Sequence, residues 1–178
     1  MLGFDLVVVT FAACCAWLGP AAEALLPARP QGVSKSAMQP MKGRAVAIEL
    51  GPAYTESGMT DPAGEIANPL AASLADRYGL RFEPGRPAAA DALVLGMHTL
   101  EWVVVAGIKD YQLRYRGEAT LVDRADGRTL GRAWCDRRVS TGKNSYDASL
   151  ADRPALAGAL GAAASSCGQQ LKESLLGG

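Results

Sequence analysis

Four cysteines are the residues of this chain best suited to covalent chemistry: Cys14, Cys15, Cys135 and Cys167. If processing removes the first two, Cys135 and Cys167 remain as the one possible pair. Their bond would close a loop of about 32 residues, which is worth about 3 to 4 kcal/mol in the chain-entropy model. An oxidising compartment favours closure, so we expect a disulfide. The alternative is two buried free thiols that behave as small apolar side chains.

The amino terminus has the pattern of an export signal. Residues 6–18 form a run of thirteen residues without a charge, shorter than the roughly 20 that a membrane-spanning helix needs. Ala22 and Ala24 place small residues where a signal peptidase reads them. We therefore expect residues 1–24 to be a signal peptide cut after Ala24, although Asp5 and the lack of an early Lys or Arg are atypical.

Two other interpretations of this segment stay open. Phe11–Cys14 is a loose lipobox, in which Cys14 would be lipidated and Cys15 would be left as an odd thiol. A lipid anchor of that kind makes a protein peripheral to the membrane. The other interpretation is a buried amino-terminal helix of a cytoplasmic protein.

His98, the single histidine of the chain, is the one candidate for imidazole catalysis. Glu101 falls on the opposite face of an extended strand from His98, because side chains alternate along a strand. The chain lacks a zinc-binding spacing and a nucleophile elbow, and Arg137 stands where a phosphate loop needs its leading glycine. We expect a structural histidine, no catalytic residue, no metal, no cofactor and no enzyme.

Arginines gather near the expected hairpin and suggest an anionic partner. Arg114 and Arg116 share one strand face, and with Arg128 and Arg132 they are candidate contacts for an anionic polymer. More basic residues crowd the same region, namely Arg124, Arg137, Arg138 and Lys143. The alternative is a solvated charged face that protects a sheet edge. Because 18 basic residues balance 18 acidic ones over the chain, we expect no nucleic-acid binding.

The elements that position these residues follow from hydrophobic periodicity. Residues 111–123 alternate as a half-buried strand does, and Asp126-Gly127 is a hairpin turn leading to a partner strand over 129–139. Further strands are expected over 44–50 and 92–106. In the latter, Trp102–Val105 is either core or an exposed contact site.

Two helices complete the expected fold. One begins at Asn68 and ends at Gly79. The second begins near Asp152 and carries Leu156, Leu160, Ala163, Cys167, Leu171 and Leu175 on one stripe, so a bond to Cys135 would join the last helix to the last strand. The order β-α-β-β-β-α predicts an α+β fold, with one mostly antiparallel four-stranded sheet and two helices on one face. Residues 25–42 contain three prolines and no period, which predicts a flexible linker before a single domain over 43–178.

This arrangement resembles small bacterial envelope lipoproteins, and is similar to the TolB amino-terminal domain and to lipoproteins of curli and exopolysaccharide export. The residues that carry the resemblance are Tyr111–Tyr115, Leu121–Asp123, Asp126-Gly127, Leu130, Cys135 and Cys167. The resemblance implies a periplasmic or outer-membrane-associated accessory protein that binds an envelope partner or self-associates. The alternative is a module that binds an anionic polymer or a small ligand through the arginine-rich face.

Overall fold

One mixed sheet of five strands organises the protein. The computed structural model describes residues 30–53 and 59–177. The strands are β1 (Ala45–Leu50), β2 (Arg81–Phe82), β3 (Leu93–Ala106), β4 (Tyr111–Asp123) and β5 (Arg128–Ser140). They lie in the order β2-β1-β3-β4-β5. β1 pairs in parallel with β2 and β3, whereas β3, β4 and β5 are antiparallel neighbours.

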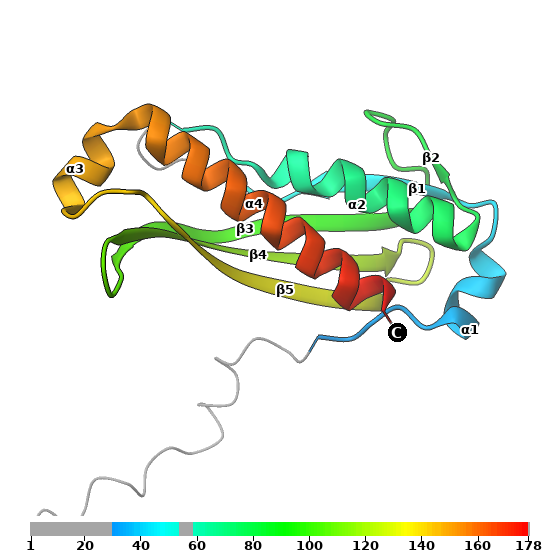
Figure 1. The fold of residues 1–178 in the computed structure, drawn as a ribbon. Helices are drawn as coiled ribbons and strands as arrows, with labels where there is room; N and C mark the ends of the chain where they lie inside the picture. The colour runs from blue at the N-terminus through cyan, green and yellow to red at the C-terminus, as the bar shows by residue number, and fades with distance from the viewer. Residues whose placement is uncertain (1–29, 54–58, 178) are drawn as a thin grey trace, which may run out of the picture.

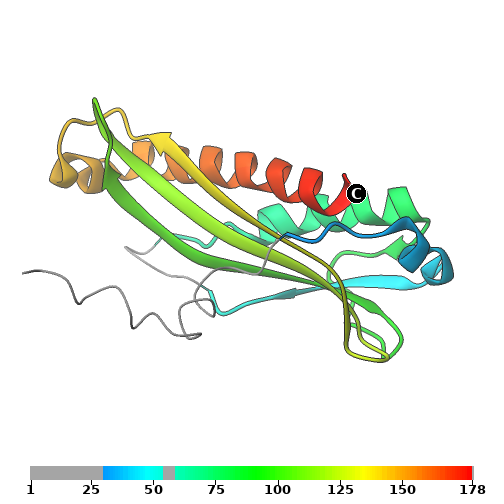
Figure 2. The ribbon, with the colours of Figure 1, turned by 90° about the horizontal axis from the view of Figure 1, so that it is seen from below.

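Two long helices cover one face of this sheet. α2 (Ala63–Tyr78) and α4 (Arg153–Leu176) lie on the same side of the strands (Figure 1). The core fills the space between them, and its largest fully buried side chains include Trp102, Tyr115 and Leu171. Seen from below, the opposite face of β3, β4 and β5 is uncovered by any helix that the structure describes (Figure 2). We call this surface the open face.

The predicted four-stranded, mostly antiparallel sheet is therefore wrong in two respects, although the α+β class with both helices on one face is correct. β2 has only two residues, in a proline-rich stretch with no visible period, so periodicity could not reveal it. β1 is parallel to β3 because α2 carries the chain back along the sheet between them.

One inserted residue changes the phase of β3. The register against β4 shifts between Thr99 and Glu101, so Leu100 is a β-bulge. Before the bulge, Met97 and Thr99 face the helices. After it, Trp102 and Val104 do, and both are buried. The prediction of core packing is thus correct for these two members of the 102–105 stretch, while Val103 and Val105 are partly exposed on the open face.

The described part of the predicted linker, residues 30–42, packs against the domain. It forms α1 (Lys35–Met38) and the 3-10 helix η2 (Gln39–Met41). Val33, Met38 and Met41 are each at most 5% exposed. Burial of these apolar side chains offsets the cost of ordering a polar, proline-containing segment, so these residues are not a flexible linker.

The helices differ from the prediction mainly at their starts. α2 begins at Ala63, whose N–H donates to Asp61 at 2.9 Å, and it contains Pro69 within its second turn. Gly79 ends it in the left-handed conformation, as predicted. A short helix, α3 (Tyr146–Ala151), precedes α4, and its amino terminus is capped by Ser145. The predicted signal peptide, the cleavage site after Ala24 and Cys14 lie outside the described residues.

Candidate interaction surface

Charged side chains of alternating sign cross the open face. Arg116 on β4 lies between Glu101 on β3 and Asp136 on β5, at N–O distances of 3.2 and 3.9 Å. All three side chains point away from the helices, because their strand neighbours of opposite phase are buried beneath them. The result is a row of acid, base and acid across three strands.

Arg114 makes the strongest contact on this surface. Its guanidinium donates to both carboxylate oxygens of Asp136, with Nε at 3.0 and 3.1 Å. This hydrogen bond holds the pKa of Asp136 below its usual range, against a smaller opposing effect of burial, and raises the pKa of Arg114. Such a charge-assisted, two-pronged contact orients both side chains across β4 and β5.

The other two predicted anion contacts also have acidic partners. Arg132 Nε lies 2.9 Å from Glu118, and Arg128 Nε lies 3.7 Å from Asp126 in the hairpin. Each of the four predicted arginines is thus within ion-pair distance of a carboxylate. Their positive charge is largely compensated within the surface itself.

Apolar side chains lie among these charges. Val103 and Val105 project from β3 beyond the bulge, and Trp134 projects from β5 opposite Glu118. All three are partly exposed. Aromatic side chains and arginines set among polar groups are the composition of protein-binding surfaces.

His98 lies on the open face with Glu101, contrary to the prediction that the two residues point to opposite sides. The bulge at Leu100 inverts the alternation between them. His98 stands opposite Glu118 on β4, and its ring packs over Gly51, where a β-carbon would lie 2.8 Å from His98 Cγ. The structure gives the His98 side chain no hydrogen bond or ion pair with any residue of 30–53 or 59–177.

Cys135 and Cys167 join the two layers of the fold. Cys135 lies on the helix-covered side of β5, and Cys167 is fully buried on the facing side of α4. Their Cα atoms are 5.4 Å apart and the sulfur atoms lie at disulfide distance. This is the place that the spacing of the leucine stripe predicts for the pair.

A buried polar chain that sequence reasoning missed connects α2 to the sheet. Thr99 Oγ1 donates to Asp61 at 2.5 Å and lies 2.8 Å from the hydroxyl of Tyr115, which is fully buried. Burial raises the pKa of Tyr115 to about 12, and the hydrogen bond with Thr99 opposes this only in part. The three residues are distant in sequence, so no local pattern could bring them together.

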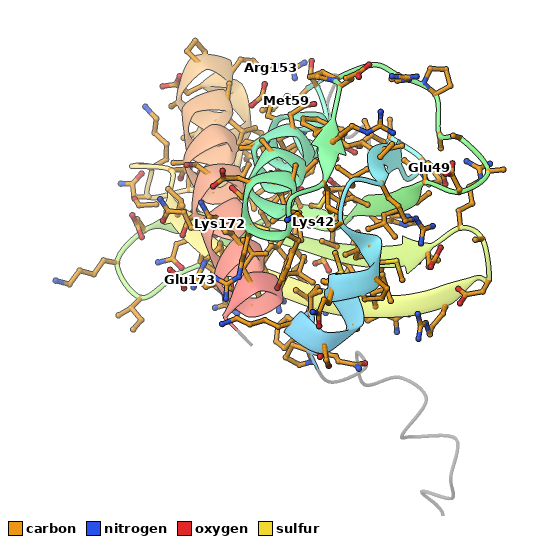
Figure 3. All side chains as sticks on the ribbon, turned by 90° about the vertical axis from the view of Figure 1, so that its right-hand side faces the viewer. Lys42, Glu49, Met59, Arg153, Lys172 and Glu173 are labelled. Carbon is orange, nitrogen blue, oxygen red and sulfur yellow. A yellow bond between two sulfur atoms is a disulfide. The ribbon has the colours of Figure 1, made fainter. Side chains whose placement is uncertain are left out.

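A groove of about 360 Å³ runs between α2 and α4, on the helix-covered side of the sheet, opposite the open face. Gly161, Ser165 and Gly168 of α4 line it opposite Pro69 of α2, and Lys172, labelled in Figure 3, lies along the same helix. The small side chains let the helices approach, since a β-carbon on Gly168 would meet Ile66 at 3.4 Å.

Within the described ranges, no three acidic, cysteine or histidine side chains converge as metal ligands would. Over the same residues, no helix combines the length and apolar character needed to cross a bilayer.

No protein-family model matches the sequence, and no curated protein matches it. Among solved structures, the fold is similar to PelC from Paraburkholderia phytofirmans, solved as a dodecamer, with 19% identity over 83% of this chain and 94% of that chain and a TM-score of 0.48. It is also similar to a lipoprotein from Neisseria meningitidis, with 16% identity over 68% of this chain and 99% of that chain and a TM-score of 0.37. A minor lipoprotein from Acinetobacter baumannii shows 14% identity over 72% of this chain and 90% of that chain, with a TM-score of 0.35.

These likenesses concern the arrangement of the backbone. Two of these neighbours are named as lipoproteins, and the likeness of this chain to the TolB amino-terminal domain stays a prediction.

Proposed function

We propose that the chain is an exported, non-enzymatic accessory protein of the cell envelope that binds a folded protein partner through the open face of its sheet. The observation that carries this proposal is the compensated charge pattern of that face. Arg114, Arg116 and Arg132 each pair with a carboxylate there, and Val103 and Trp134 lie on the same face beside these charged side chains.

The charge pattern favours a protein over an anionic polymer. A polyanion gains its binding free energy from cations that lack counter-charges and release condensed ions, and the four predicted arginines already have carboxylate partners. A partner surface with the inverse order of charges gains register and specificity from the same pattern. Export is supported by the amino-terminal apolar run and by a cysteine pair placed to close between β5 and α4.

Site-specific photo-crosslinking tests the surface. A photo-crosslinker at Val103 on the open face should give one defined protein adduct in envelope fractions, whereas the matched position Ala157, exposed on α4, should give none. The exchange of Glu118→Arg with Arg132→Glu keeps the internal ion pair but inverts its sign to a partner. We expect this exchange to abolish the Val103 adduct while the protein stays folded.

Three results would overturn the proposal. Adducts that form equally from both positions, or survive the exchange, would remove the open face as the binding surface. Salt-dependent binding of polyphosphate that is lost on Arg114→Ala with Arg116→Ala would establish the anionic-polymer function instead. Full-length protein with Met1 intact in the cytosol would remove export.

A further inference from the structure

β5 is an edge strand that already accepts an extended segment on part of its length. Gln31 N–H donates to the Arg132 carbonyl at 2.7 Å, and Arg132 N–H donates to the Gln31 carbonyl at 2.9 Å. This antiparallel bridge lies outside the named strands. Val33, two residues on, leaves the edge and donates its N–H to the Leu175 carbonyl. The edge of β5 therefore binds backbone by strand addition at this point.

The remaining part of that edge, residues 134–140, presents backbone groups in the same direction. The register of β5 against β4 is unbroken from Gly131 to Ser140. The backbone N–H and C=O groups of Trp134, Asp136 and Arg138 therefore point away from β4, as those of Arg132 do. These outward N–H and C=O groups have no backbone partner among residues 30–53 and 59–177. The free stretch is seven residues long, or roughly 23 Å at about 3.3 Å per residue.

We propose that a second copy of this chain adds to this free edge, so that two β5 strands pair in antiparallel fashion across a two-fold axis at Arg137. About this axis, residues 134–140 of one copy lie opposite residues 140–134 of the other. A contact of this kind is self-complementary and closes at two copies. The contact is made by the backbone edge of β5, with the Asp136 and Arg138 side chains beside it on the open face, and it does not depend on the function proposed for that face.

Charge complementarity selects this register. The axis at Arg137 places Asp136 of either copy opposite Arg138 of the other copy, which gives two cross-strand pairs of opposite charge. Arg138 is exposed and lowers the pKa of the adjacent Asp136 through its charge. The alternative register, with the axis at Asp136, sets the two Asp136 carboxylates against each other. The one unfavourable pair in the selected register is formed by the two Arg137 residues, one from each copy, which lie opposite each other at the axis.

Sedimentation equilibrium of the purified, oxidised protein tests the proposal. The protein should show a monomer–dimer equilibrium. Arg138→Pro removes an outward N–H without removing a bond to β4, and should leave only monomer. Arg138→Asp places like charges at the same contact and should weaken the dimer at least tenfold. The matched change Arg77→Asp, on the exposed side of α2, should leave the equilibrium unchanged. Circular dichroism and thermal unfolding confirm that each variant is folded.

The charge at the axis separates the two registers. Arg137→Thr should tighten the dimer several-fold because it removes the like-charge pair. If Asp136→Asn tightens it instead, the register proposed here is wrong. Two results would overturn the proposed contact between two copies: a protein that stays monomeric at the highest attainable concentration, or a dimer that survives both Arg138 variants. A monomer whose edge binds a different polypeptide counts among the first of these results. The Val103 adduct is unaffected by that outcome, so the two proposals fail separately.

Discussion

Arg44 and Asp123 form a two-pronged ion pair that joins β1 to the end of β4 across the intervening strand. The Arg44 guanidinium donates to the two carboxylate oxygens of Asp123 at 2.6 and 2.8 Å. It also donates from Nε to the carbonyl of Asp91 at 2.7 Å. The Asp123 side chain is 5% exposed, so Arg44 supplies its principal counter-charge.

Removal of Arg44 should be among the most damaging changes of a charged residue in this protein. Arg44→Met leaves Asp123 buried and uncompensated, and we expect the free energy of unfolding to fall by about 3 kcal/mol. Urea unfolding measures this. Arg86→Met is the matched control, because Arg86 pairs with Glu83 where both side chains are about 60% exposed. That change should cost at most about 0.5 kcal/mol, and equal effects of the two variants would contradict the prediction.

Acid should destabilise the protein through two carboxylates. Hydrogen bonds from Arg44 and Arg114 hold the pKa of Asp123 and of Asp136 below the ordinary value of an aspartate side chain. A carboxyl whose pKa is lower when folded contributes stability above its unfolded pKa, and this contribution is lost as the pH falls through the folded pKa. We expect the free energy of unfolding to decrease below about pH 4. Replacement of both residues by Asn should flatten this decrease, and an unchanged slope in that variant would assign it to other groups.

Reduction of the cysteine pair should lower stability without altering the fold. A loop of 32 residues predicts a loss of about 3 to 4 kcal/mol in the free energy of unfolding. Urea unfolding with and without reductant measures the effect, and the double variant Cys135→Ala with Cys167→Ala should be insensitive to reductant. Mass spectrometry of the native protein should show a gain of two hydrogen atoms on reduction. The absence of that gain would mean that the cysteines are free thiols.

The buried chain of Asp61, Thr99 and Tyr115 should be sensitive to loss of its central hydroxyl. Thr99→Val keeps the shape of the side chain but leaves the Tyr115 hydroxyl without this partner, and we expect a loss of about 1 to 3 kcal/mol. Thr129→Val, at an exposed position of β5, is the matched control and should be nearly neutral. Thermal unfolding distinguishes the two, and a neutral Thr99→Val would show that the network contributes little.

Two glycines should respond to alanine in opposite ways. A β-carbon on Gly158 in α4 meets no atom within 4 Å, and Gly158→Ala should raise stability by about 0.5 to 1 kcal/mol. A β-carbon on Gly131 would lie 2.5 Å from Val33 Cγ2, so Gly131→Ala must displace the segment that bridges β5. Hydrogen exchange at the Arg132 amide should speed up in that variant alone. Protection that stays unchanged would show that Val33 adapts in place.

The antiparallel half of the fold was predictable because its pattern is local. β4 runs from Tyr111 to Asp123 as the alternation predicts, and β5 extends the predicted 129–139 by one residue at each end. The leucine stripe of α4 also identified which side of Cys167 faces the sheet. In each case, neighbouring residues carry the whole signal.

The remaining features depend on distant residues. Arg44, Asp91 and Asp123 meet only because β1 and β3 are parallel, and residues 30–42 pack because β5 and α4 offer a surface for Val33. The sequence grouped the four arginines as candidate anion contacts, and this role stays a prediction. The carboxylate partners of Arg114, Arg116 and Arg132 on neighbouring strands follow from register. The register between paired strands decides which arginine lies opposite which carboxylate, and the amino-acid composition of the strands does not.

The single extra residue at Leu100 has a consequence for any comparison of sequences across β3. A chain that lacks this residue would carry the same alternation in the opposite phase after position 99, so an ungapped alignment would match its core positions to Glu101, Val103 and Val105. A one-residue gap at Leu100, which is 43% exposed, restores the correspondence. Deletion of Leu100 should therefore straighten β3 and leave Trp102 on the helix-covered side, because Thr99, Glu101 and Trp102 then follow the ordinary alternation of a strand.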